Sequence, residues 1–231
     1  MAIKRKSSSK KIYLAIILLV VLIAASAAAI IAYQPKVAGV TVGVHVGDTF
    51  TYELKGFSNL TSIEAVETPG FSQLNDTDYY QVTITGVNGT VVSLDTLWRF
   101  NDGTQTTAQQ TIDLSDGNTT DANGFWPIYA SNLNVGDLLR PKGYDSVTVN
   151  ASSVMDYANS SRPINYMHTG GESKLMTDPS GSTLRYDSIE IYFDKKTGML
   201  ESMVWITDYN NPEMREVTTW TLVDTSVWAV Q

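Results

Sequence analysis

Six asparagines occur in the triplet Asn-x-Ser/Thr, which is the acceptor for N-linked glycans. None has proline in the middle position, and they are Asn59, Asn75, Asn88, Asn118, Asn150 and Asn159. Glycan transfer needs such a triplet on an accessible part of an exported chain. We therefore predict that at least two of them carry glycans, with Asn88 disfavoured because a tight turn would leave it little room. The alternative is that a chain rich in Ser and Thr forms these triplets by chance.

A polar loop holds four side chains whose oxygens could bind calcium. These weak calcium candidates are Asp116, Asn118, Asp121 and Asn123. Calcium requires six to eight oxygen ligands on a flexible loop, and the loop lacks both the spacing and the final bidentate Glu of an EF-hand. The pattern is more typical of a solvated loop.

Residues that could perform hydrolysis are sparse. The chain has no cysteine and only two histidines, His45 and His168. Thiol catalysis, thiolate zinc sites and disulfides are therefore excluded. A Ser-His-Asp triad would need one of the two histidines, and no Gly-x-Ser-x-Gly turn accompanies them. We predict ordinary surface or strand histidines, no catalytic residue, no metal and no cofactor, with a carboxylate-based hydrolase as an alternative.

The segment that positions the whole chain is an apolar run at residues 12–32, which carries no charge. About 20 apolar residues span the ~30 Å hydrocarbon layer as a helix. Five cations precede it within residues 1–11, and an excess of cations holds that side in the cytoplasm. We predict a cytoplasmic basic leader at 1–11, a transmembrane signal anchor at 12–32 in contact with the lipid bilayer, a tether at 33–43 and an extracellular domain at 44–231.

A cleaved signal peptide is the alternative for this segment, since Ala25-Ser26-Ala27 has the small-x-small form of a cleavage site. The apolar run continues to residue 32, however, beyond the about 7–15 residues of a secretory core. Both interpretations place the C-terminal part outside the cell membrane.

Charge excludes one class of partner. Residues 12–231 hold 11 of the 16 cations and all 24 anions, a net charge of −13. A nucleic-acid binder needs a basic face for the phosphates. The exported domain therefore does not bind nucleic acid.

The exported domain has the period-two pattern of strands. Large apolar residues alternate with polar ones in the segments 49–54, 80–87 and 186–193, and Thr, Val, Tyr and Trp are abundant. Hairpin turns are indicated at Asn88-Gly89, at Asp102-Gly103 and at residues 194–198. We predict one antiparallel, mainly β domain, either a curved half-barrel or a sandwich.

Three further segments are assigned from their composition. A capping box beginning at Thr61 predicts a short helix that ends at Pro69-Gly70. The aromatic-rich segment 124–130 is expected to pack into the core beneath a loop. The segment 220–228 is expected to be a final strand.

Four phrases resemble, in their order, a family of uncharacterised archaeal membrane-anchored surface proteins with a β-rich extracellular domain. They are VGDTFTYEL at 46–54, LNDTDYYQVTITGVNGT at 74–90, IYASNLNVGDLL at 128–139 and IYFDKKTGMLESM at 191–203. The resemblance implies an archaeal source and export, and it transfers no catalytic residue. The layout is also similar to that of archaeal pilins, but Lys10-Lys11 runs directly into Ile12 without the pilin cleavage pattern.

These observations predict a non-catalytic, membrane-anchored cell-surface glycoprotein with a binding or shielding role in the envelope. Its expected partners are the lipid bilayer and either an envelope protein or a small hydrophobic ligand. The alternatives are a carrier that holds a lipid or another small hydrophobic ligand in a half-barrel cavity, a surface hydrolase and a pilin-like filament subunit.

Overall fold

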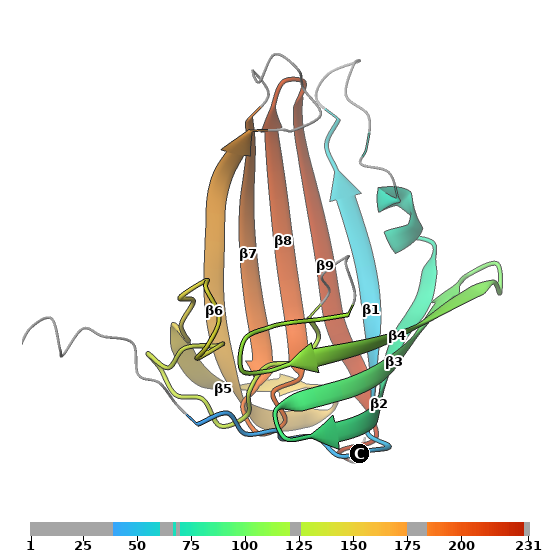
Figure 1. Ribbon diagram of the computed structural model, residues 1–231. Coiled ribbons are helices and arrows are strands. Elements are labelled where there is room, and N and C mark those ends of the chain that lie inside the picture. Colours follow the sequence, from blue (N-terminus) through green and yellow to red (C-terminus); the bar gives the residue numbers. More distant parts are fainter. Residues whose placement is uncertain (1–38, 61–66, 68–69, 121–125, 175–183, 229–231) are drawn as a thin grey trace, which may run out of the picture. The chain divides into compact units, whose positions relative to one another are not determined.

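The computed structural model describes residues 39–60, 67, 70–120, 126–174 and 184–228 (Figure 1). The chain divides into two units, 1–36 and 37–231, and all the described residues belong to the second. The predicted leader, the membrane span at 12–32, the start of the tether and the helix predicted from Thr61 lie outside these ranges. Within the described ranges, no helix has the length and apolar character needed to cross a membrane.

The described chain forms nine antiparallel strands in one sheet, which confirms the prediction of a mainly β domain. A single short 3-10 helix, η1 (Phe71–Leu74), occurs in this part of the chain. The strands are β1 (Thr49–Ser58), β2 (Thr77–Asn88), β3 (Val91–Phe100), β4 (Gln105–Asp113), β5 (Ala151–Tyr157), β6 (Ser160–Lys174), β7 (Leu184–Asp194), β8 (Leu200–Asn210) and β9 (Glu213–Thr225).

The strand order is β4-β3-β2-β1-β9-β8-β7-β6-β5. Strands β1–β4 form one meander and β5–β9 form another. The pairing of β1 with β9 joins the two meanders, and its register runs from Phe50 opposite Thr225 to Ser58 opposite Glu216. The first and last strands of the domain therefore lie side by side at the middle of the sheet.

The hairpin turns lie close to the predicted positions. Gly103 and Gly198 adopt positive φ angles of 85° and 79° in two of them. The turn predicted at Asn88-Gly89 was placed one residue too early. Asn88 still pairs with Val91, so the two turn residues are Gly89 and Thr90, and of these two only Gly89 has positive φ.

The core lies where β2–β4 cross in front of the lower parts of β6–β9 (Figure 1). Phe50 and Tyr52 of β1 are completely buried there, and Ile84 and Phe193 from the two meanders belong to the same cluster. The segment 126–130 also enters this core. Its residues 128–130 are buried, which confirms the packing predicted for this part of the aromatic-rich segment.

Strands β6–β9 extend beyond β2–β4 as a free part of the sheet (Figure 1). We call this part the distal wall and define it as residues 168–174, 184–190, 203–210 and 213–219. Of the wall residues whose burial is described, only Thr207, Met214 and Glu216 are buried. The inner face of the wall continues the face that carries the core, and the outer face is the opposite one.

Candidate functional site

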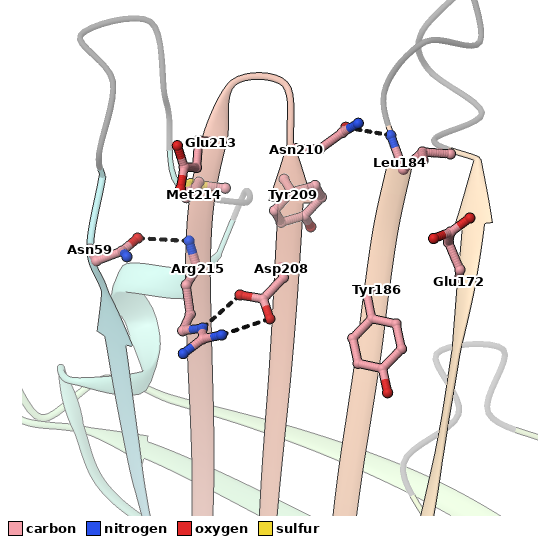
Figure 2. Close-up of a pocket in the computed structure, with 10 residues that line it drawn as sticks. All are labelled: Asn59, Glu172, Leu184, Tyr186, Asp208, Tyr209, Asn210, Glu213, Met214 and Arg215. Carbon is pink, nitrogen blue, oxygen red and sulfur yellow. Dashed lines mark hydrogen bonds and ion pairs between the residues drawn. The ribbon is translucent and has the colours of Figure 1, made fainter.

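An open pocket of about 640 Å³ lies at the free end of the distal wall (Figure 2). It is the tip pocket, and it combines acidic, amide and aromatic side chains. Its lining residues are Asn59, Glu172, Leu184, Tyr186, Asp208, Tyr209, Asn210, Glu213, Met214 and Arg215.

A transverse row of residues on four strands forms the floor of the tip pocket. Glu172 of β6 lies opposite Tyr186 of β7, which lies opposite Asp208 of β8, which in turn lies opposite Arg215 of β9. Directly opposite residues point to the same face of a sheet. The register therefore places four chemically different side chains side by side on the outer face.

Hydrogen bonds hold the rim of the tip pocket. Arg215 donates to both carboxylate oxygens of Asp208, from Nε at 2.6 Å and from a terminal nitrogen at 2.9 Å. The hydrogen bond to Asp208 raises the pKa of Arg215 above its ordinary value. At one side Asn59 Oδ1 accepts from the backbone N–H of Arg215 at 2.7 Å, and at the other Asn210 Oδ1 accepts from the N–H of Leu184 at 2.6 Å (Figure 2).

The charges of the tip pocket are mostly negative. The lining contains three carboxylates, those of Glu172, Asp208 and Glu213, and one guanidinium, that of Arg215. Tyr186 adds an aromatic surface that is 46% exposed. The arrangement can bind a polar or basic group, with the aromatic ring providing apolar contact.

The inner face of the distal wall carries a separate polar cluster around Asp187. Its Oδ1 accepts hydrogen bonds from Arg185, from Trp205 Nε1 at 2.9 Å and from Thr207 Oγ1 at 2.9 Å. Burial acts to raise the pKa of Asp187, but these hydrogen bonds outweigh it and hold the pKa below its ordinary value. A hollow of about 180 Å³ beside the cluster is partly lined by Phe71 of η1. The cluster fixes the inner face of the wall rather than leaving a reactive group free.

The six predicted glycosylation sites are all exposed. They lie after β1 (Asn59), after η1 (Asn75), at the end of β2 (Asn88), after β4 (Asn118), before β5 (Asn150) and in the β5–β6 turn (Asn159).

Besides Asn59, whose Oδ1 accepts from the N–H of Arg215, three of these sites have hydrogen-bonded side-chain amides. Asn75 exchanges two bonds of 2.9 Å with the backbone of Gly56. Asn118 Nδ2 donates to Asp116, and Asn150 Oδ1 accepts from the N–H of His168 at 2.7 Å. In each of these amides at least one N–H or lone pair remains for water.

The weak calcium candidates are only partly described. Asp116 accepts two bonds of 2.8 Å from Asn118, one from its backbone N–H and one from Nδ2. Asp121 and Asn123 lie outside the described residues. Among the described residues, no group of three or more His, Asp or Glu side chains has the arrangement of a metal site.

The two histidines are in different surroundings. His45 lies in the loop before β1, where its backbone N–H donates to Asp48 at 2.8 Å. His168 is an exposed residue of β6, and its Nε2 lies 3.1 Å from Ser188 Oγ of β7. No local pattern in the sequence pairs His168 with Ser188, because the contact depends on strand register.

A buried ion pair closes the turn between β7 and β8. Arg162 donates to the two oxygens of Asp194 at 2.6 and 3.1 Å, and Tyr157 donates to Asp194 at 2.5 Å. Burial acts to raise the pKa of Asp194, but the bonds from Arg162 and Tyr157 outweigh it and keep the pKa below its ordinary value. Thr197 completes the site with bonds from its N–H and its hydroxyl. All of these bonds satisfy the carboxylate, so we interpret the group as structural.

Glu201 of β8 is a second buried acid, and it has a different environment. Its side chain is 5% exposed, and among the described residues its Oε2 has no hydrogen-bond partner. Burial raises the pKa of Glu201 to about 7. The group lies at the irregular register between β7 and β8, where Tyr192 is opposite Ser202 and Phe193 is opposite Leu200.

The sequence indicated neither the tip pocket nor the Asp187 cluster, because each joins residues from several strands. The spacing Arg185-x-Asp187 places the two side chains on one face of a strand, and it was the one local signal for the inner cluster. Comparison with known proteins finds no family model that matches this chain and no curated protein that is similar to it.

Proposed function

We propose that this protein is a non-catalytic, membrane-anchored cell-surface glycoprotein of archaeal type whose distal wall binds a component of the envelope. In this proposal residues 12–32 hold the chain in the membrane and the β domain lies outside. The sheet acts as a half-barrel whose base is filled by side chains and whose distal wall is the contact surface.

The position of the glycosylation triplets is the observation that carries this proposal. All six asparagines are exposed, and the last triplet begins at Asn159. No triplet occurs from residue 160 onward, the stretch that contains β6–β9 and the distal wall. Five of the six asparagines do not line the tip pocket, so glycans there would cover other surfaces, whereas Asn59 lines the pocket and a glycan on it would border the opening.

The net charge also supports an exposed role. A domain with a large net negative charge stays hydrated and resists non-specific association. Within the wall, the acidic rim of the tip pocket favours a basic group on the partner. A carrier of hydrophobic ligands ranks second, because Phe50, Ile84 and Phe193 fill the lower part of the sheet interior.

Protease treatment of intact cells, followed by mass spectrometry of glycopeptides, tests location and modification together. We expect residues 39–228 to be digested from outside and at least two of the six asparagines to carry glycans. A domain that is digested only after lysis and carries no glycan would overturn the proposal.

Photo-crosslinking on living cells tests the contact surface. A photoreactive amino acid at position 186, in the tip pocket, should form adducts with an envelope component. The control is position 144, whose Tyr side chain is fully exposed but lies in the loop between β4 and β5. Equal crosslinking at the two positions would contradict a contact surface on the wall.

Activity measurements test the hydrolase alternative. A hydrolase based on the His168–Ser188 contact would make Ser188 reactive towards fluorophosphonate probes. We expect no labelling of Ser188, whereas labelling that disappears in Ser188→Ala would favour the enzyme.

A further inference from the structure

Strand β5 is an open edge of the sheet. It pairs with β6 on one side only and ends the strand order. Six consecutive residues, 151–156, are exposed, so both faces of the strand are uncovered over this length. Its two central apolar side chains, Val154 and Met155, are 67% and 39% exposed.

The hairpin geometry defines which backbone groups of β5 point outward. Ala158 and Asn159 form a two-residue turn with positive φ at both positions, and Tyr157 and Ser160 flank it as a pair. Flanking residues of such a turn bond to each other, and bonded and non-bonded pairs then alternate. Ser152, Val154 and Asp156 therefore direct their N–H and C=O groups away from β6.

Pro163 gives independent evidence for this orientation. It lies opposite Val154, it has no N–H, and its C=O accepts a bond from Lys195 on the other side of β6. Pro163 thus offers no backbone bond to Val154. In the described part of the chain, no hydrogen bond reaches the outward groups of Ser152, Val154 or Asp156.

The other edge of the sheet is strand β4, and unlike β5 it is partly protected. The second half of β4 is covered by the following loop, where Thr111 exchanges bonds with Thr120 and Ile112 bridges to Thr119. The uncovered half, residues 105–109, contains only Gln, Thr and Ala. Edge strands are commonly protected by proline, lysine or a bulge, and residues 151–157 include no proline or lysine.

We propose that β5 pairs antiparallel with β5 of a second copy of this chain, about a two-fold axis at Val154. In this register Val154 lies opposite its own copy, Ser152 lies opposite Asp156 of the partner, and Ser153 lies opposite Met155. Asp156, the one charged residue of the strand, therefore faces a serine and not another carboxylate.

The self-pairing satisfies the exposed backbone and buries the apolar centre. Three outward pairs with two bonds each give about six hydrogen bonds. A two-fold axis makes the contact isologous, so the pairing closes at a dimer and does not propagate. Asn150 and Asn159 lie at the two ends of β5, outside the outward positions, so glycans there would border the interface without occupying it.

Cysteine crosslinking tests this pairing, because the natural chain has no cysteine. The full-length chain with Val154→Cys is oxidised in membranes of a bacterial host, which leaves the asparagines unmodified. Cα atoms of a directly opposite bonded pair lie about 5.5 Å apart, within the range of a disulfide. Val46→Cys is the matched control, since Val46 is 65% exposed in the loop before β1. We expect at least about tenfold more covalent dimer from Val154→Cys.

A backbone substitution tests the hydrogen bonds separately. Val154→Pro removes an N–H that points away from β6, so the β5–β6 hairpin should persist while the dimer of the detergent-solubilised full-length chain becomes a monomer in sedimentation. Should this variant fail to fold, Val154→Asp, which places two carboxylates at the axis, serves instead. Equal crosslinking at positions 154 and 46, or a dimer that survives the substitutions at Val154, would overturn the proposal. Neither result depends on glycosylation or on binding at the distal wall.

Discussion

Glu201 is the residue whose chemistry departs most from what its position in the sequence suggests. A glutamate that begins a strand after a turn is ordinarily a solvated group. Here it is buried, and burial raises its pKa to about 7 from an ordinary value of 4.5. The folded protein therefore holds the proton more tightly than the unfolded chain does.

This raised pKa predicts how stability changes with pH. The protonated side chain of Glu201 contributes to the free energy of unfolding. This contribution is complete below pH 4.5 and is lost as pH rises through 7, because the unfolded chain loses its proton first. The loss corresponds to about 3 kcal/mol by pH 8. From pH 5 to pH 8, the free energy of unfolding measured in urea should decrease less for Glu201→Gln than for the wild type. Glu172→Gln, at an exposed position, should leave the decrease unchanged, and an unchanged decrease in Glu201→Gln would contradict the assignment.

The ion pair of Asp194 and Arg162 gives the second prediction for single residues. Asp194→Asn removes the charge that compensates Arg162, whose side chain is only 13% exposed. Breaking a buried pair in this way costs about 3–5 kcal/mol. Asp208→Asn breaks the much more exposed pair with Arg215 and should cost about 1 kcal/mol or less. Chemical denaturation compares the two variants, and equal losses would show that the Asp194 pair is not structural.

At the scale of the element, the hairpin between β7 and β8 has a tightly constrained turn. Gly198 has φ of 79°, and a Cβ at this position would lie 2.1 Å from the carbonyl oxygen of Tyr129. The turn therefore requires glycine for two reasons, its backbone angle and the close approach of the segment that enters the core.

Alanine substitutions at Gly198 and Gly89 separate the effect of the backbone angle from the effect of the steric clash. Gly198→Ala meets both the backbone penalty and the clash, whereas Gly89→Ala has positive φ but no atom within 4 Å of the new Cβ. A left-handed non-glycine residue costs about 1–2 kcal/mol. We expect that loss for Gly89→Ala and a clearly larger one for Gly198→Ala, measured by thermal unfolding. Similar losses would mean that the core segment moves aside without cost.

The strands that could be predicted are those whose alternation reflects the core. In β1, Phe50, Tyr52 and Leu54 are all buried, so the period of two was visible in the sequence. Strand β4 pairs fully with β3 but has an exposed first half and no such alternation. Strand β6 contains Pro163 and two adjacent glycines, which locally argue against a strand. Strands β4 and β6 form because neighbouring strands pair with them, and a local sequence pattern does not reveal that pairing.

The tip pocket could not be predicted from the sequence either, because it also depends on how the strands pair. Glu172, Tyr186, Asp208 and Arg215 are separated by up to 43 residues, and only the pairing register brings them into one row. Sequence patterns did indicate the turns and the exposed asparagines, because both depend on a few adjacent residues. A register error of one residue would move any of the four to the opposite face.

At the scale of the whole molecule, the domain depends on its last strand. β9 pairs with β1 along nearly the whole length of β1, and Trp228 beyond it stacks on Arg162 with 3.8 Å between the guanidinium carbon and the ring centre. The two meanders share no other strand pairing within the described sheet.

Truncation measures this dependence. A chain that stops after Trp228 keeps β9 and the Arg162 contact, and it should resist proteolysis like the full chain. A chain that stops after Pro212 lacks β9 and leaves β1 and β8 each with only one of their two neighbours, so it should be digested rapidly in a limited-proteolysis time course. A protease-resistant core in the shorter chain would show that one of the two meanders folds without β9.

The central position of the first and last strands has a consequence for biogenesis. Synthesis proceeds from β1 to β9, so β1 can pair early with β2 but waits for its second neighbour, β9, until residues 213–225 have been made. Contacts between such distant parts of a sequence form slowly. Under the proposed export, this strand order would delay closure of the sheet until β9 has been synthesised.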